Sequence, residues 1–437
     1  MFRGYPLDLI TRMRTDELNN KDEFPRMYKV LQIFPPRGLP DPGLAVEAAL
    51  ASSALDQKLR PGMTVGITAG SRGIRNIVTI LRKTADYVKS LGCRPVLIAA
   101  MGSHGGGSPE GQRELLSSLG ITEDSTGAAL LCSTDCFVVG RAFYGDVYLN
   151  SCVLKCDAII VVNRVKPHTS FHGDHESGLL KMLAVGLGGP RGAASLHRCR
   201  PDQLSQAVAE GGQCVLKAAP VVLGLAILED AYEQTAKVAA INPEDFVNAE
   251  KTLLEEARSY LPRLPVDDLD ILIVDEIGKN ISGTGMDTNV IGRLRIQGAP
   301  EPASPRIRRI AVLDLTPETK GNAYGIGLAD FTTERLAAKF DRKSVYTNAL
   351  TSTFVQRAML PMVLPDDRAV LRACQKSLGL ASLREARIIR IKNTLHLSEM
   401  LVSESVYKDI SELPAIRLLQ QPSSLQFSRE GYLLPFK

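Results

Sequence analysis

Five of the chain's six histidines lie between positions 104 and 197, and two of them stand where catalytic groups are common. His104 follows one apolar run that is expected to form a strand, and His168 closely follows another. In a parallel α/β sheet, residues just beyond the carboxyl ends of the strands line the ligand crevice. Because imidazole exchanges protons near neutral pH, these two histidines are candidates for acid–base chemistry at one edge of a sheet.

Lys181 is embedded in an apolar stretch, between Leu179-Leu180 and Met182-Leu183. A lysine among such neighbours is desolvated, which lowers its pKa and makes its amine nucleophilic. The same pattern also fits a lysine that packs its stem and extends its amine to water. The residues alone leave both interpretations open.

The remaining histidines of the cluster have two interpretations each. His172 and His175 stand with Asp174 and Glu176 in a polar stretch, which is typical of a solvated loop but would also suit a cation site. His197 lies in a stretch expected to be helical, where a histidine is often simply exposed. Neither pattern assigns a function by itself.

The elements around these residues alternate between short apolar runs and helical stretches. Strands are expected at 63–67, 95–100 and 157–162, with a helix at 76–91 and a helix start at Ser108-Pro109-Glu110. The continuous apolar character of the third strand suits a sheet that is covered on both faces. Strands alternating with helices predict a mostly parallel sheet.

The fold class expected from this pattern is α/β, with two α/β domains, mostly parallel sheets and an active-site cleft between them. A Pro-punctuated linker at 261–265 separates a first domain, 1–265, from a second, 266–386. The tail, about 387–437, is expected to pack back on the first domain. Further strands are expected at 270–275, 310–315 and 387–391.

The composition excludes several classes of protein. The chain has 437 residues, 44% of them hydrophobic and 23% charged, which is typical of a folded protein of more than one domain. A formal charge of +4 is too slight to indicate a nucleic-acid surface, and no apolar run is long enough for a membrane span. The start of the chain shows no apolar signal segment, so we expect a cytoplasmic protein whose eight cysteines are reduced.

Four short motifs, in order, carry a resemblance to a known family. They are Gly102-Ser103-His104, Pro167-His168, Ser177-Gly178-Leu179-Leu180-Lys181, and His197, which stands sixteen positions after Lys181. With these motifs the chain resembles the catalytic subunit of the nickel-pincer lactate racemase family, as a divergent member. The resemblance extends from about Gly66 to Asn289.

The resemblance implies a cofactor and the residues that hold it. Lys181 would be covalently linked to a nickel-pincer nucleotide, a pyridinium mononucleotide with thioamide and thiocarboxylate donors. Ser71 and Gly178 would contribute to cofactor binding, and His197 would complete the square-planar nickel site. Cofactor-assembly enzymes would then be transient partners.

The resemblance also implies a reaction, the racemisation or epimerisation of a small 2-hydroxy acid by reversible hydride transfer. His104 and His168 would be the two acid/base residues. Arg72, and Arg295 from the second domain, would hold anionic groups of the substrate. The expected partners are therefore a small hydroxy-carboxylate, with no nucleic acid and no membrane.

The chain departs from the family where substrate would bind. Ala69 replaces an aspartate, Gly105 an arginine and Gly292 a glutamine, and the glycine-rich loops at 277–287 and 320–327 also differ. Lysine and asparagine in these loops could bind substrate oxygens or serve only the loops' structure. These departures predict a hydroxy acid other than lactate.

Two alternatives from other functional classes remain open. One is a hydroxy-acid dehydratase or lyase that uses a divalent cation held by His172, Asp174 and His175. The other is a non-catalytic relative that binds a carboxylic acid without turnover.

Overall fold

The computed structural model describes residues 24–435, and the chain divides into two compact units. We call Pro35–Leu261 the central unit, and the chain up to Phe34 and from Pro262 onward the terminal unit. The start of the chain, where we expected no signal segment, lies outside the described residues. The cleft expected between the two domains stays a prediction.

The central unit is built on a six-stranded sheet in which only the last strand is antiparallel to its neighbour. The strands expected at 63–67, 95–100 and 157–162 are confirmed as β2, β3 and β7. In spatial order the strands are β4 (Ala129–Leu131), β3 (Arg94–Ala99), β2 (Thr64–Ala69), β7 (Ala158–Arg164), β8 (Val221–Glu229) and β9 (Thr235–Ile241).

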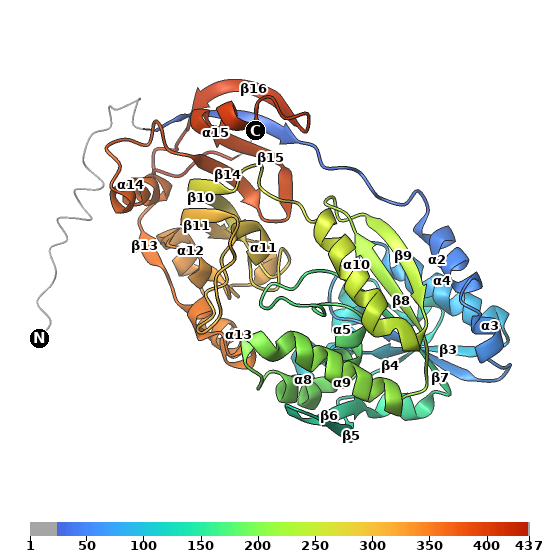
Figure 1. The fold of residues 1–437 in the computed structure, drawn as a ribbon. Helices are drawn as coiled ribbons and strands as arrows, with labels where there is room; N and C mark the ends of the chain where they lie inside the picture. The colour runs from blue at the N-terminus through green and yellow to red at the C-terminus, as the bar shows by residue number, and fades with distance from the viewer. Residues whose placement is uncertain (1–23, 436–437) are drawn as a thin grey trace, which may run out of the picture. The chain divides into compact units, whose positions relative to one another are not determined.

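Helices cover both faces of this sheet (Figure 1). On one face, Ile80 and Leu81 of α4 pack in a core with Ile67 of β2, and all three are fully buried. On the other face, Gly224 of β8 lacks a side chain, which leaves room for Phe246 of α10. Each large apolar side chain buried in this way contributes about 1.5–3 kcal/mol to the free energy of folding, so the helices on both faces stabilise the sheet.

The helices of the central unit include the one expected at 76–91, which is α4, and the one expected to start at Ser108, which is α5. A separate two-stranded ribbon joins β5 (Cys136–Ala142) to β6 (Gly145–Asn150). The helices are α2 (Pro42–Ala51), α3 (Leu55–Lys58), α4 (Ile77–Ser90), α5 (Pro109–Ser118), α6 (Glu123–Thr126), α7 (Leu179–Lys181), α8 (Gly189–Leu196), α9 (Leu204–Ala218) and α10 (Phe246–Tyr260).

The terminal unit has an eight-stranded mixed sheet with four parallel and three antiparallel pairings. Its strands, in spatial order, are β13 (Met362–Leu364), β12 (Phe331–Thr333), β11 (Arg306–Leu315), β10 (Asp268–Ile277), β14 (Ile388–Asn393), β15 (His396–Ser403), β1 (Arg26–Gln32) and β16 (Ile416–Ser424). Its helices are α11 (Thr288–Ile291), α12 (Glu334–Ala338), α13 (Arg342–Ser352), α14 (Asp367–Leu378) and α15 (Glu404–Ile410).

The tail, expected to pack back on the first domain, 1–265, belongs to the sheet of the terminal unit, which also contains β1 from that range. Its first strand, β14, pairs in parallel with β10, where Ile388 lies opposite Ile271, and its last strand pairs with β1. The apolar run at 387–391 correctly indicated a strand, but such a run does not specify its partner. The apolar strand β10 lies in the same unit, and β14 pairs along its side, so the strands of the tail extend that sheet.

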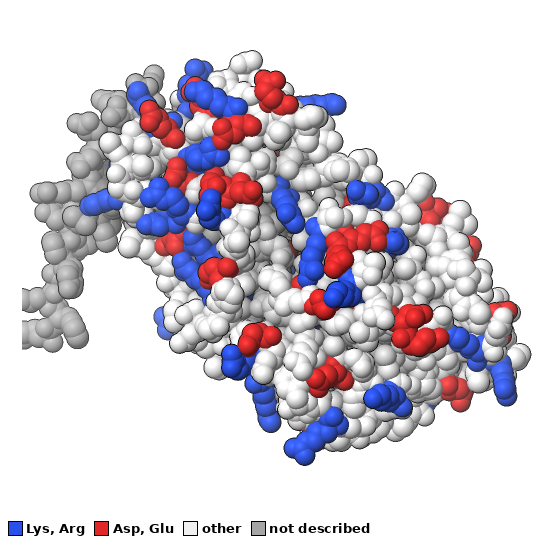
Figure 2. Space-filling model, viewed as in Figure 1, with Lys and Arg blue, Asp and Glu red and all other residues white. Residues whose placement is uncertain are grey.

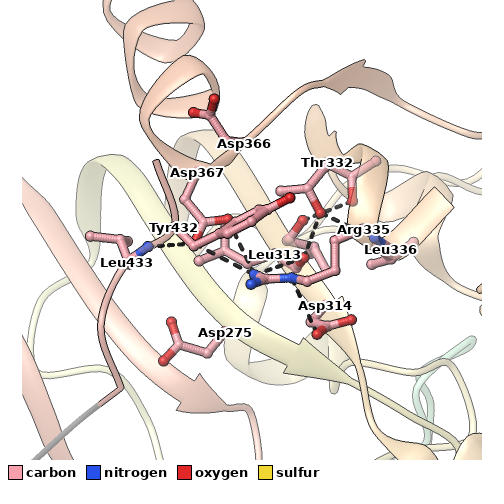
Figure 3. A network of polar contacts seen from close by, with 12 residues as sticks. Asp275, Leu313, Asp314, Thr332, Arg335, Leu336, Asp366, Asp367, Tyr432 and Leu433 are labelled. Atoms are coloured by element: carbon pink, nitrogen blue, oxygen red, sulfur yellow. Dashed lines mark hydrogen bonds and ion pairs between the residues drawn. The ribbon is translucent and has the colours of Figure 1, made fainter. Parts of the chain in front are cut away.

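A charged network fixes the end of the tail to the carboxyl ends of the parallel strands (Figure 3). Asp367, at the start of α14, accepts a hydrogen bond of 2.7 Å from the Leu433 N–H and pairs with Arg335 at 3.2 Å. The Arg335 guanidinium also lies 4.5 Å from the ring centroid of Tyr432. The network therefore joins residues more than sixty positions apart.

Asp367 is expected to make stability depend on pH. Burial, opposed by Arg335, raises its pKa from 3.8 to about 6, so the folded state binds the proton more tightly than the unfolded state. Its stabilising contribution is therefore complete below about pH 4 and is lost as pH rises through about 6. In urea unfolding between pH 4 and 7, the wild type should lose about 2 kcal/mol relative to Asp367→Asn. Parallel stability curves for the two proteins would contradict this prediction.

Surface properties of the described residues agree with the composition. Basic and acidic side chains are interspersed on the visible face of each unit (Figure 2). None of the helices within residues 24–435 is long and apolar enough to cross a membrane. All eight cysteines are free thiols, as expected.

Candidate active site

Three loops that carry predicted site residues follow three adjacent parallel strands of the central unit. Ser71 and Arg72 follow β2, His104 follows β3, and His168 follows β7. Because β3, β2 and β7 are neighbours and run in the same direction, their carboxyl ends meet at one edge of the sheet. The topology thus brings these loops together.

His104 is linked to the loop that follows β2. Its Nδ1 lies 2.5 Å from the Ser71 Oγ, so the two loops share a hydrogen bond. His104 is exposed and Ser71 is half-buried. An exposed imidazole that is oriented by a hydroxyl is suited to exchange a proton with a ligand.

The loop that carries His168 is held in place by hydrogen bonds to the fully buried carboxylate of Glu176. This carboxylate accepts hydrogen bonds from the backbone N–H groups of His168, at 2.5 Å, and Gly173, at 3.1 Å, and from the Arg258 guanidinium at 2.6 Å. Burial alone would raise the pKa of Glu176, but hydrogen bonds from His172, His168 and Arg258 hold it below its ordinary value. Glu176 therefore remains ionised and positions the loop.

Lys181 ends the short helix α7, and its side chain is half-buried. Desolvation, and after it the positive charge of Arg72, lowers the pKa of its amine from 10.5 to about 7. The Nζ lies 5.3 Å from the ring centroid of Phe171. The amine therefore has a large uncharged fraction near neutral pH, which is the state that a nucleophile needs.

The start of α7 depends on a second buried carboxylate, that of Glu250 on α10. It accepts a hydrogen bond of 2.9 Å from the Leu180 N–H. A Cβ at Gly178 would lie 2.4 Å from the same carboxylate, so only glycine fits there. Gly178, which the family resemblance places in cofactor binding, thus has a structural task in holding Lys181.

His197 follows α8 directly, and its backbone N–H bonds the Ala193 carbonyl at 3.0 Å. Desolvation lowers the pKa of its imidazole to about 4, and the positive charge of Lys181 contributes to the shift. The two side chains are therefore near enough for one charge to affect the other. His197 is neutral at neutral pH and has a lone pair for a metal ion.

Arg72 differs from its neighbour Arg164 in having no partner. Arg164 forms a short ion pair with Glu229, the last residue of β8. Among residues 24–435, Arg72 has no hydrogen bond or ion pair, and its pKa is lowered by desolvation and by the charge of Arg164. An unpaired guanidinium at this edge would gain from binding an anion.

Arg295 lies in the terminal unit, where its guanidinium is engaged by the fold. It donates to the carbonyls of Gly327, at 2.6 Å, and Ala329, at 3.0 Å, and to the Asp330 carboxylate at 2.6 Å. These contacts join two loops of the terminal unit. They explain Arg295 structurally, and its expected contact with substrate remains a prediction.

The lysines and asparagines of the glycine-rich loops are engaged in a similar way. The Lys279 Nζ donates to the Gly283 carbonyl at 2.6 Å, and the Asn280 side chain accepts from the Thr316 hydroxyl at 2.7 Å. Of the two interpretations left open by the sequence, these bonds favour the structural one.

The polar loop that could have held a divalent cation directs its side chains to separate partners. Asp174 pairs with Lys251 at 2.9 Å, and the His175 Nδ1 lies 3.6 Å from Glu250. Within the part of the chain that the structure describes, no group of three or more His, Cys, Asp or Glu side chains could hold a metal ion. The cation site of the dehydratase alternative is therefore not supported.

Sequence reasoning missed the residues that position the site. Glu250 and Arg258 on α10 hold the start of α7 and the loop before it, seventy and eighty-two positions earlier in the chain. In the sequence, Glu176 is only one of the acidic residues in a polar stretch. The only local pattern that involves them is that Glu250 and Arg258 lie eight positions apart on one helix. Such a pair of charged residues is too common to indicate a site.

The low pKa of Lys181 leads to a prediction for the protein without cofactor. With acetic anhydride at neutral pH, Lys181 should be acetylated about a hundredfold faster than exposed Lys217, because far more of its amine is uncharged. Arg72→Ala removes a positive charge, so it should raise the pKa of Lys181 and slow this labelling. Peptide mass spectrometry measures both rates.

Arg75→Ala is the matched control, since Arg75 lies in the same loop but is not among the charges that shift Lys181. It should leave the labelling rate unchanged. Equal effects of the Arg72 and Arg75 variants would show that the charge of Arg72 does not act on Lys181.

One solved structure supports the fold on which this site is built. The chain is similar to the lactate racemase apoprotein from Thermoanaerobacterium thermosaccharolyticum, with a TM-score of 0.51 and 10% sequence identity. The similarity covers 87% of this chain and 95% of that chain. No family model matches the sequence, and no curated protein matches it either. The likeness supports the mixed α/β fold with mostly parallel sheets.

Proposed function

We propose that the protein is a racemase or epimerase of a 2-hydroxy acid that carries a nickel-pincer nucleotide on Lys181. The observation that supports this most strongly is the electrostatic effect of Lys181 on His197. Both are desolvated, and the charge of Lys181 lowers the pKa of His197. The fold likeness to the lactate racemase apoprotein supports the same reading.

The residues fit the implied cofactor. The Lys181 amine, with its pKa near 7, would hold the nucleotide as the nitrogen of the thioamide. The neutral His197 imidazole is a donor that Ni(II) accepts in square-planar sites alongside sulfur ligands. When bound, this cofactor supplies a reversible hydride acceptor whose electronic properties nickel tunes.

The chain's own residues would supply binding and proton transfer. Arg72, which has no partner among the described residues, would hold the substrate carboxylate. A histidine must take the hydroxyl proton while the bond between C2 and hydrogen breaks, and return it when that bond reforms. His104 and His168 occupy the same edge of the sheet as Arg72.

The test is expression together with the cofactor-assembly enzymes, followed by incubation with single enantiomers of several 2-hydroxy acids. Chiral chromatography should detect the opposite enantiomer with no change in mass. A keto product formed by loss of water would indicate a dehydratase instead. Binding of the acids without any turnover, in protein that has not taken up nickel, would indicate a non-catalytic relative.

A further inference from the structure

One stretch of the terminal unit has many exposed apolar side chains and no exposed charge. Of the fifteen large apolar side chains that are exposed within residues 24–435, six lie between positions 346 and 362. From 344 to 365 the only charged residue is Arg357, and its side chain is fully buried. We call the six exposed side chains the apolar patch; they are Tyr346, Leu350, Val355, Met359, Leu360 and Met362.

The patch is unusual for a surface that faces water. Such surfaces normally carry interspersed charges of both signs and only single apolar side chains. In this chain 23% of all residues are charged, so an uncharged stretch of this length on the surface is a marked departure from the average.

Helix α13 has a second apolar stripe that its own unit does not cover. Val345 and Ala349 are buried, and they form the stripe that faces the unit. Tyr346 and Leu350 are exposed and are also four positions apart, so they lie together on another face of the helix. A helix at a protein surface needs only one apolar stripe for its own packing. The outward stripe therefore remains available for a partner.

The rest of the patch adjoins this helix. The short 3₁₀-helix Val355–Ala358 packs against α13, and β13 follows it at the end of the eight-stranded sheet. Pro361 and Pro365 flank β13, and proline has no N–H with which to pair another strand. A partner would therefore bind through side-chain packing rather than by adding a strand to the sheet.

The same surface has both a projecting side chain and a cavity. Leu350 is the most exposed residue of the patch, at 74%. Met359 and Leu360, together with Ile296, contribute to the lining of a cavity of about 600 Å³. This cavity is large enough to accept a leucine side chain from another molecule.

A two-fold axis would use both features twice. In a two-fold contact the same surface of each copy faces the other, so the Leu350 side chain of each copy can enter the cavity of the other. Residues near such an axis face their own counterparts, and a charge there would meet a like charge. The absence of exposed charge between 344 and 365 removes this repulsion.

The area of the patch is sufficient for a stable dimer. On average, more than half of the area of each of the six residues is exposed. At about 200 Å² for a large side chain, the patch therefore presents roughly 600 Å². Two copies would together bury roughly 1,200 Å², which reaches the range of specific protein–protein interfaces.

We propose that the apolar patch is the contact surface of a two-fold symmetric homodimer, and that its occupant is the patch of a second copy of this chain. The contact involves only the terminal unit of each copy. It does not depend on the proposed function, so neither result decides the other.

The direct test is sedimentation velocity of the full-length protein without cofactor. Interfaces near this size have dissociation constants in the micromolar range or below, so we expect the mass of two chains at about 100 µM. A single chain at that concentration would overturn the proposal. A protein that stays a single chain and floats with phosphatidylcholine vesicles would show that a lipid surface covers the patch, which would also overturn it.

A matched pair of variants tests the surface. Leu350→Asp would bury an unpaired charge in the contact, so it should raise the dissociation constant of the dimer about 100-fold. Leu154→Asp is the control, because Leu154 is 73% exposed but lies in the central unit, outside the patch. The control should leave the dissociation constant unchanged. Equal dissociation constants for the two variants would overturn the proposal.

Amide hydrogen exchange locates the contact without any variant. Peptides from 342–364 should exchange more slowly at about 100 µM than at about 1 µM, because dimer formation covers this stretch. Slower exchange confined to other parts of the chain would place the contact elsewhere and overturn the proposal.

Discussion

Lys181→Ala protein, expressed with the cofactor-assembly enzymes, is expected to carry no covalent adduct and to have no turnover. The reason is that desolvation lowers the pKa of this amine to about 7 and that its charge acts on the imidazole of His197. Intact-protein mass spectrometry measures the adduct, and tryptic mapping should place it on the peptide that contains Lys181 in the wild type. Stability should hardly change, because the variant removes a desolvated charge rather than a paired one.

Matched variants separate the tether from the other functions of the site. His104→Gln should keep the adduct and lose turnover, since His104 lies on another loop and, in the proposed function, acts on substrate. His197→Ala should keep the adduct but retain much less nickel, as measured by metal analysis. An adduct that persists in Lys181→Ala would place the tether elsewhere and remove the main support for the proposed function.

Local patterns predicted the loops of this site because the determinants of the loops are themselves local. The apolar runs before Ser71, His104 and His168 form adjacent parallel strands, and such strands place their following loops at one edge. The apolar neighbours of Lys181 left a desolvated amine as one of two interpretations, and the lowered pKa favours that one. These conclusions needed no long-range information.

Features that depend on contacts distant in the sequence could not be predicted. The β14 run shows that a strand exists, but the choice of β10 as its neighbour depends on which buried edge is available. Glu250 supports Leu180 from seventy positions away, and no local pattern links the two. The carbonyl partners of Arg295 in the terminal unit are likewise distant in the sequence, and the substrate contact that the family resemblance implies for this residue stays a prediction.

The three departures from the lactate racemase pattern are built into the fold. Ala69 is fully buried at the end of β2, where an aspartate would be a desolvated charge. At Gly292 φ is +58°, and a Cβ would lie 1.9 Å from the Pro305 carbonyl oxygen. Larger side chains at these positions would require the backbone to move.

Gly105, the third departure, leads to the second prediction. Its φ is +69°, and a Cβ would lie 2.7–2.8 Å from backbone atoms of Gly111 and Gln112, at the start of α5. Gly105→Ala combines left-handed strain of about 1–2 kcal/mol with an overlap that costs about 1–3 kcal/mol more. We therefore expect it to lower the free energy of unfolding by about 3–4 kcal/mol. Urea unfolding of the protein without cofactor measures the change.

The adjacent Gly106 provides the matched control, because its φ is +64° but a Cβ there would meet nothing within 4 Å. Gly106→Ala should therefore cost only the backbone strain, about 1–2 kcal/mol. Since Gly105 directly follows His104, its alanine variant should also displace the imidazole from Ser71 and reduce turnover of the loaded enzyme more than the control does. Equal costs for the two variants would show that the contact with α5 does not determine the residue at 105. The arginine of lactate racemases would then be sterically acceptable at this position, and its absence would have to be explained by the substrate alone.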